Sequence, residues 1–408
     1  MEQKLSFPPV KEQLDILQRG VEDFVSPEAL EEKLEASRKK GVPLRVKLGA
    51  DPSRPDLHIG HGVVLRKLRE FQDLGHQAIL IIGDFTASIG DPTGRNKTRP
   101  PITLAESRVH GESYLEQASV ILDGERLEVV HNGDWLNPLN FTDVIKLSAQ
   151  VTVAQMLERD DFSQRYKSGT PISLHEFLYP LAQAQDSVHL KSDVELGGTD
   201  QLFNLLMGRE LQKKVGQSPQ VIMTVPLLEG TDGVEKMSKS YDNYIGLTDS
   251  PDQMFGKILS IPDNMIIKYL TLVTDLPMDE VKDVEARMAQ GDNPRDFKRL
   301  LGRELVKVYY DTDAANGAQE AFDQIFIKKD IPDDMPELEI LVSDSESLLS
   351  ALDKSGLFAS KGEIRRLIKQ NAVAIDGAKT QDEYHSFGTA GEFVIKAGKR
   401  KFIRITCK

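Results

Sequence analysis

The spacing of apolar residues predicts strands that alternate with helices in the first 245 positions. Apolar and polar residues alternate over residues 44–50, and this period of two is typical of a strand. The segment 78–82 is apolar throughout, which favours a central strand of a parallel sheet. Further strands are predicted over 126–131 and 221–228, and the helical spacing of apolar residues predicts a helix over 59–74. Such alternation predicts a parallel sheet with helices on both faces.

Capping residues mark the starts of further helices. Ser26 followed by proline opens one helix, and the segments 103–106 and 173–176 have the pattern of a capping box. Because Pro180 follows the second box, we expect a kink in that helix. From about residue 251 to 329 the pattern is helical with no clear strand. This part contains a row of basic residues spaced four positions apart, namely Arg295, Arg299, Arg303 and Lys307. Either a solvated helix face or contact with a nucleic-acid backbone explains the row.

The last 63 residues differ from the rest of the chain in charge. Residues 346–408 contain 12 Lys/Arg and 7 Asp/Glu, a net charge of +5, so that the remainder of this −13 chain carries −18. Helices are predicted near 348–352 and over 361–369, then a strand at 373–375 and a terminal hairpin up to 405. The segment rich in proline and aspartate before this part is typical of a linker. The asymmetry favours a polyanion bound at one end, although an ordinary basic surface gives the same pattern.

Length and composition limit the class of protein. A chain of 408 residues, 39% hydrophobic and 28% charged, is expected to be globular with two to four domains. No apolar run approaches the ~20 residues that cross a bilayer, and residues 1–5 show no signal-peptide pattern. Cys407 is the single cysteine, which excludes an intramolecular disulfide and a cysteine-based zinc site. We therefore expect a cytoplasmic protein that has no membrane partner.

Two histidines at the start of the predicted helix 59–74 are candidates for anion binding. His58 and His61 are three positions apart, so both point from the same helix end, where backbone amides and the helix dipole favour negative charge. Gly60 between them allows a flat ligand to approach the backbone. This arrangement suits the phosphates of a nucleoside triphosphate. Two surface histidines near a helix cap remain the alternative.

A second candidate is the sequence Lys-Met-Ser-Lys-Ser at 236–240, in a loop flanked by glycines. Lys236 and Lys239 could close over a polyphosphate and neutralise the charge that develops during transfer at phosphorus. Taken alone, a solvated loop explains these lysines as well. Motifs for other nucleotide sites, metalloproteases and serine hydrolases are missing from the sequence, and we expect no dedicated metal site.

Together, the two motifs resemble those of a class I aminoacyl-tRNA synthetase. The wording of residues 51–61, Asp-Pro-Ser-Arg-Pro-Asp-Leu-His-Ile-Gly-His, is similar to that of the bacterial-type tyrosyl-tRNA synthetases, and the resemblance covers nearly the whole chain. It implies a Rossmann-like catalytic domain, then an α-helical anticodon-binding domain and a small α+β RNA-binding domain. The implied bounds are 1–228 for the catalytic domain, 229–246 for the KMSKS loop, 247–330 for the helical domain, 331–345 for a linker and 346–408 for the basic domain.

A pocket for the amino acid can be argued first from spacing. Tyr179, Gln183 and Asp186 fall on one face of the helix expected after Ser173, so they could line one cavity. A buried carboxylate needs a donor, which a substrate phenol would supply. In the resembled family the matching aspartate accepts from the substrate hydroxyl, while the tyrosine and glutamine lie near the substrate ammonium. A polar surface face is the alternative.

The resemblance implies roles for further residues. Asp91 is expected to meet the substrate ammonium and Gln201 the substrate, whereas Asp200 is expected to hold the ATP ribose. The remaining ATP contacts are implied for Gly60, Arg95 and Ser238, and catalysis for His58, His61, Lys236 and Lys239. Many tyrosyl enzymes carry a tyrosine on the first strand that also bonds the substrate hydroxyl, but the matching position is Lys47, which leaves Asp186 as the main acceptor.

The implied reaction joins tyrosine to tRNA(Tyr) with ATP as a substrate, brought with Mg²⁺ and without a tightly bound cofactor. The implied enzyme is a homodimer. Contacts with the tRNA backbone are expected from basic residues of the tail, namely Lys361, Arg365, Arg366, Lys369, Lys399 and Arg400. Three alternatives remain: a tryptophanyl-type synthetase, a small-molecule nucleotidyltransferase, and a non-catalytic RNA-binding protein with the same fold.

Overall fold

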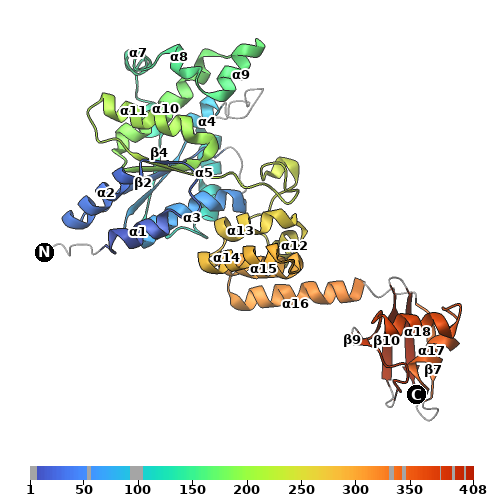
Figure 1. Cartoon of the computed structure of the whole chain (residues 1–408). Coiled ribbons are helices and arrows are strands. Elements are labelled where there is room, and N and C mark those ends of the chain that lie inside the picture. Colours follow the sequence, from blue (N-terminus) through green and yellow to red (C-terminus); the bar gives the residue numbers. More distant parts are fainter. Residues whose placement is uncertain are drawn as a thin grey trace. The chain divides into compact units, whose positions relative to one another are not determined.

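A computed structural model describes residues 7–52, 57–91, 104–329, 335–341, 346–376, 378–387, 391–398 and 401–408. The chain forms two compact units, Met1–Ala318 and Gln319–Lys408, and each is described by itself (Figure 1). Among the described residues, no helix is both long enough and apolar enough to cross a bilayer.

The first unit is built on a six-stranded sheet with the order β1-β6-β5-β2-β3-β4. Its strands are β1 (Phe24–Val25), β2 (Arg45–Ala50), β3 (Gln77–Ile82), β4 (Leu127–His131), β5 (Val194–Gly198) and β6 (Val221–Val225). Neighbouring strands are parallel except for β1, which runs antiparallel to β6. The chain runs outward from β2 to β3 and β4 on one side, and then forms β5 and β6 on the other. The switch point of the sheet therefore lies between β2 and β5, where ligands bind beyond the carboxyl ends of the strands.

Helices lie on both faces of this sheet (Figure 1). Helix α3 (Ile59–Asp73) packs on β2, β3, β5 and β6, and α11 (Leu202–Lys214), which packs on β5 and β6, lies beside α10 (Leu178–Leu190) on the opposite face. The other helices before residue 250 are α1 (Val10–Leu17), α2 (Pro27–Lys40), α4 (Asp84–Ile89), α5 (Leu104–Ala118), α6 (Gly133–Leu136), α7 (Phe141–Ser148), α8 (Val153–Met156) and α9 (Asp160–Ser168). Short 3-10 turns are η1 (Gly124–Arg126), η2 (Leu174–Phe177), η3 (Thr199–Gln201), η4 (Lys239–Tyr241) and η5 (Asp263–Met265).

The helices after residue 250 belong to the same compact unit as the sheet. They are α12 (Pro251–Ser260), α13 (Ile266–Val273), α14 (Met278–Ala289) and α15 (Pro294–Tyr309), and α16 (Thr312–Lys329) follows them. Helix α15 buries Leu301, Leu305 and Tyr309, which recur every four positions along one side of the helix. Helix α13 also packs against α3, so the helical part contacts the helix that begins at the histidine pair.

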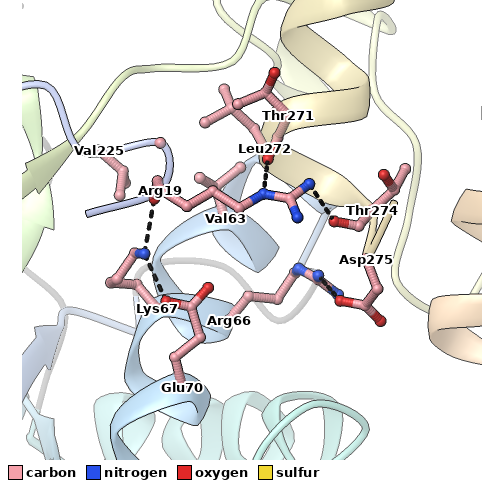
Figure 2. Close-up of a pocket in the computed structure, with 11 residues that line it drawn as sticks. Arg19, Val63, Arg66, Lys67, Glu70, Val225, Thr271, Leu272, Thr274 and Asp275 are labelled. Carbon is pink, nitrogen blue, oxygen red and sulfur yellow. Dashed lines mark hydrogen bonds and ion pairs between the residues drawn. The ribbon is translucent and has the colours of Figure 1, made fainter. Parts of the chain in front are cut away.

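A polar network joins α3 to the end of α13 (Figure 2). The Arg19 guanidinium donates to main-chain carbonyls of α13 and of Thr274 just after it. Lys67 on α3 donates from Nζ to Arg19 O at 2.7 Å and to Glu70 Oε2 at 2.6 Å. Arg66 pairs with Asp275. These charged groups therefore satisfy one another at the contact between α3 and α13.

The second unit is a small α+β fold. Its sheet has the order β7-β11-β10-β8-β9, with β7 (Glu337–Ile340), β8 (Val373–Ile375), β9 (Ala378–Thr380), β10 (Gly391–Ala397) and β11 (Lys401–Cys407). Helices α17 (Leu348–Lys354) and α18 (Lys361–Lys369) contribute Leu348, Leu352, Ile364 and Ile368 to a core that also contains Ile395 and Ile405 of the hairpin.

Most predicted elements are confirmed, including the α/β class, the parallel sheet, the helices after residue 250 and the terminal hairpin β10–β11. The helix expected from Ser173 begins instead at Leu178, and Ser173 precedes the 3-10 turn η2. The kink at Pro180 was expected because the residue was placed inside the helix. Pro180 lies instead in the first turn of α10, where an amide hydrogen would have no acceptor within the helix. Thr103 lies outside the described residues.

Candidate active site

The histidine pair lies at the start of α3, directly beyond the carboxyl end of β2. His58 is the N-cap residue, and its backbone N–H donates to Nδ1 of His61 at 3.3 Å. The centres of the two rings are 3.9 Å apart. Gly60 is needed for this packing, because a Cβ at that position would lie 3.0 Å from His58 Nδ1. The two imidazoles therefore form one compact unit at the positive end of the helix dipole.

The KMSKS loop packs against this helix start. The main chain after the loop pairs with the main chain before α3, since Ile59 N donates to Ile245 O at 2.9 Å and Leu247 N donates to Leu57 O at 3.1 Å. Met237 of the loop is buried and lies close to Gly60, since a Cβ added to Gly60 would be 3.6 Å from the Cβ of Met237. Two segments that are more than 180 positions apart in the sequence at these main-chain pairs are thus held side by side.

Hydrogen bonds within the loop fix its shape. The Asn243 side chain accepts from Ser238 N at 2.8 Å and donates to Asp232 Oδ2 at 2.6 Å. Ser238 Oγ in turn accepts from Ser240 N at 3.2 Å. Lys239 begins the turn η4, and its side chain is exposed, as is that of Lys236. The loop thus presents both lysines to solvent from a fixed base.

Electrostatic interactions place Lys236 close to the helix start. Burial lowers the pKa of His58 to about 2 and that of His61 to about 4, and the positive charge of Lys236 contributes to both shifts. Burial also raises the pKa of Asp200, and Lys236 opposes that rise. Both imidazoles are therefore neutral near pH 7, so each can donate one N–H to a phosphate oxygen.

The aspartate of α10 is a buried carboxyl group with two donors. Asp186 Oδ1 accepts from Trp135 Nε1 at 2.9 Å, and Oδ2 accepts from Asn132 Nδ2 at 3.3 Å. Burial raises the pKa of Asp186 to about 7, although the positive charge of Lys47 acts in the opposite direction. A carboxyl group with a pKa near 7 is partly protonated at neutral pH. A further hydrogen-bond donor favours its carboxylate form, so the group loses its proton when such a donor binds.

Three more predicted residues, Asp91, Gln201 and Tyr179, make polar contacts near the ends of β2 and β5. Asp91 accepts from Gln201 Nε2 at 2.9 Å and from Arg159 at 3.0 Å. The Tyr179 hydroxyl donates to Asp51 Oδ2 at 2.8 Å. Burial raises the pKa of Tyr179, as do the negative charges of Asp51 and Asp91. These contacts link α10, β2 and η3 at the switch point of the sheet.

Gln183 forms a hydrogen bond with Glu195, which was not predicted as a site residue from the sequence. Its Nε2 donates to Glu195 Oε1 at 3.2 Å, and the same oxygen lies 2.6 Å from Lys47 Nζ. Both charged side chains are buried, with 0% and 2% exposure. Asn132, Trp135, Asp51 and Arg159 were likewise missed. A single charged residue inside an apolar strand, as in Val194-Glu195-Leu196, was the signal that could have found this pair.

Some predicted residues are not part of this cluster or cannot be placed. Arg95, Lys399 and Arg400 lie outside the described residues. The other four predicted RNA contacts, Lys361, Arg365, Arg366 and Lys369, are exposed on α18 of the second unit. Within the described residues, no group of three or more His, Cys, Asp or Glu side chains could hold a metal ion.

Two family models together match residues 39–405 of the chain. Residues 39–327 match the family model "tRNA synthetases class I (W and Y)", and residues 327–405 match "Tyrosine--tRNA ligase SYY-like C-terminal domain". The tyrosine–tRNA ligase of Salinibacter ruber is 53% identical over 405 residues, covering 98% of each chain. That of Thermotoga maritima is 53% identical over 397 residues, covering 97% of this chain and 98% of the other.

Solved structures share the fold. Tyrosyl-tRNA synthetase of Archaeoglobus fulgidus, complexed with L-tyrosine, has a TM-score of 0.62 at 23% identity and covers 76% of this chain and 99% of its own. The C-terminally truncated mitochondrial enzyme of Aspergillus nidulans has a TM-score of 0.62 at 24% identity, covering 78% and 94%. With the family model and the full-length relatives, the conclusion is direct: the chain belongs to the class I tRNA synthetases of the tryptophan and tyrosine type.

Proposed function

We propose that this enzyme activates L-tyrosine with ATP and transfers the tyrosyl group to the 3′ end of tRNA(Tyr). The observation that carries the proposal is the packing of the KMSKS loop on the histidine start of α3, in a unit that also buries a carboxyl group on α10. The full-length relatives named above are tyrosine–tRNA ligases, which favours tyrosine over tryptophan. The buried Asp186 supports the same choice, because a phenol hydroxyl can donate to it.

In the first step, a tyrosine carboxylate oxygen attacks the α-phosphorus of ATP, and the bond to the pyrophosphate oxygen breaks. No protein nucleophile is needed, so catalysis consists of positioning and of stabilising charge on the phosphates. We assign this stabilisation to His58 and His61, which donate as neutral imidazoles, and to Lys236 and Lys239, which approach from the loop. In the second step, a terminal ribose hydroxyl of tRNA attacks the activated carbonyl and releases AMP.

The substrates are assigned to the two sides of this site. Gly60, Ser238, Asp200 and Arg95 contact ATP, and Mg²⁺ arrives on the ATP phosphates. Tyrosine lies between β2 and α10, with its hydroxyl at Asp186. Its ammonium group lies near Asp91, and the tyrosine-side contacts are completed by Tyr179, Gln183 and Gln201.

The remaining proposals concern RNA, assembly and compartment. The basic face of α18, together with Lys399 and Arg400, contacts the tRNA backbone. The helices of residues 247–330 form the anticodon-binding part. Of the expected linker 331–345, Glu337–Ile340 form β7 in the sheet of the basic domain, so the link to that domain precedes Glu337. We further propose a cytoplasmic homodimer.

ATP–pyrophosphate exchange with each of the twenty amino acids tests the proposal. Exchange that depends on tyrosine alone is expected, followed by tyrosylation of tRNA(Tyr). Exchange with tryptophan, or RNA binding without any exchange, would exclude it.

A further inference from the structure

Lys47 is a buried cation to which the proposed function assigns no role. It lies on β2, the central strand, in register with Glu195 on β5. Its side chain has no exposed surface, and the ion pair between Lys47 Nζ and Glu195 Oε1 is 2.6 Å long. A charge this deep in a protein is costly to desolvate, so a merely structural role would be expected to satisfy all of its donors.

The ammonium group of Lys47 is only partly satisfied. Glu195 is fully engaged, because Gln183 also donates to Oε1 while Ser187 and Gln220 donate to Oε2. Lys47 carries three N–H donors. Apart from the ion pair with Glu195, its Nζ has no hydrogen-bond partner in the part of the chain that the structure describes. Donors are therefore left for an oxygen that the protein does not supply.

The surroundings of Lys47 indicate where that oxygen would lie. Lys47 lies on the α10 side of β2, because Gln183 of α10 donates to the same Glu195 oxygen that pairs with Lys47. Its positive charge also acts on Asp186 of the same helix, where the substrate hydroxyl is proposed to bind. Gly49 lies on the same face of β2 as Lys47, since side chains alternate along a strand. A Cβ built on Gly49 would meet no atom within 4 Å. This face of the central strand is thus open beside Lys47.

Building on the proposed function, we propose that Lys47 is a specificity residue that donates a hydrogen bond to the phenolic oxygen of the substrate. Asp186 at the same time accepts a hydrogen bond from the phenolic hydroxyl group. One hydroxyl group then satisfies a buried donor and a buried acceptor. Phenylalanine would leave both without a partner, and this is the situation in which a polar site rejects an analogue most strongly. The ion pair with Glu195 holds the Lys47 ammonium group in place.

The test compares a paired substitution with a matched control. Lys47→Met alone would leave the Glu195 carboxylate buried without its cation, so the test variant is Lys47→Met combined with Glu195→Gln. The control is Lys33→Met combined with Asp193→Asn, which removes a partly buried ion pair of 2.9 Å elsewhere in the same unit. Calorimetry measures the Kd of the full-length proteins for tyrosine, phenylalanine and 4-aminophenylalanine, whose para nitrogen donates well but accepts poorly.

The test variant is expected to bind tyrosine roughly 10- to 100-fold more weakly, the range for loss of a charge-assisted hydrogen bond. Its affinities for phenylalanine and 4-aminophenylalanine should stay the same or rise, because neither ligand offers Lys47 a good acceptor, and the control should match the wild type. Unchanged tyrosine affinity would overturn the proposal, and so would an equal loss for all three ligands. Failure of the proposed function is distinguishable, because the unmodified chain would then show no tyrosine binding.

Discussion

His58 and Gly246 form an antiparallel bridge between the start of α3 and the segment that follows the KMSKS loop. The bridge is flanked by hydrogen bonds on both sides, and Met237 of the loop packs over Gly60. The base of the loop is therefore fixed, while the side chains of Lys236 and Lys239 remain exposed. A fixed base with exposed lysines allows the loop to meet phosphates at the histidines without a large rearrangement of the fold.

Gly60→Val is expected to impair ATP use. A Cβ at Gly60 would press on His58 Nδ1 at 3.0 Å, and the branched side chain would also push against Met237. We expect the rate of adenylate formation to fall by about 10-fold or more with little change in tyrosine affinity. Single-turnover kinetics measure this rate. Gly256→Ala on α12 is the control, because a Cβ there would meet nothing within 4 Å, and an equal effect of both substitutions would contradict the prediction.

Tyrosine binding is expected to release a proton near neutral pH. The raised pKa of Asp186, about 7, means that part of the free enzyme carries a protonated carboxyl group at pH 6–7. A phenol that donates to this group favours the carboxylate, so binding lowers its pKa, and tyrosine affinity should rise with pH up to about 7 and then level off. Calorimetry in two buffers of different ionisation enthalpy counts the proton. Release that persists in Asp186→Asn would assign the proton to another group.

The network between α3 and α13 is expected to stabilise the first unit. Lys67→Met removes the donor to Arg19 O and leaves the Glu70 carboxylate without its ion pair. The free energy of unfolding should fall by about 1–3 kcal/mol. Urea denaturation measures it, with Lys213→Met as the control, because the exposed pair of Lys213 with Glu210 should contribute less than about 1 kcal/mol. Equal stabilities of the two variants would argue against the network.

The basic face of α18 is expected to contribute to tRNA charging and not to tyrosine activation. Lys361 and Arg365 form ion pairs with Asp353 and Glu383, so the cleaner variant is Arg366→Glu with Lys369→Glu. We expect a higher KM for tRNA, a smaller salt dependence of tRNA binding and an unchanged rate of ATP–pyrophosphate exchange. Lys379→Glu on β9 is the control.

Removal of residues 346–408 should give the same division between the two steps, with adenylate formation spared and charging weakened. Charging by the truncated chain at the wild-type rate would exclude a role for this domain.

Local patterns predicted most of the fold. The apolar stripe of α3, the apolar segment of β3 and the terminal hairpin depend on residues close together in the sequence, so periodicity was enough. Strand β5 was missed because Glu195 interrupts its apolar run. A charge in a central strand makes sense only with Lys47, which lies almost 150 positions away and pairs with it in the folded protein.

The same limit applies to the site. The histidines, the KMSKS lysines and the polar face of α10 could be predicted because each is a short motif. The donors to Asp186 could not, because Asn132 and Trp135 come from the end of β4 and from α6 and carry no motif of their own. The alternation around Lys47 predicted a strand, but it did not reveal that the lysine side chain is completely buried in the folded protein.

The central claim is that ATP is held between the imidazoles of α3 and the lysines of the loop. It is tested most directly by single-turnover adenylate formation in His61→Ala and Lys239→Ala, with the exposed His175→Ala as the control. The account predicts that both rates fall by ~10²-fold or more, with little change in tyrosine affinity and no effect of the control substitution. Wild-type rates in both variants would contradict it.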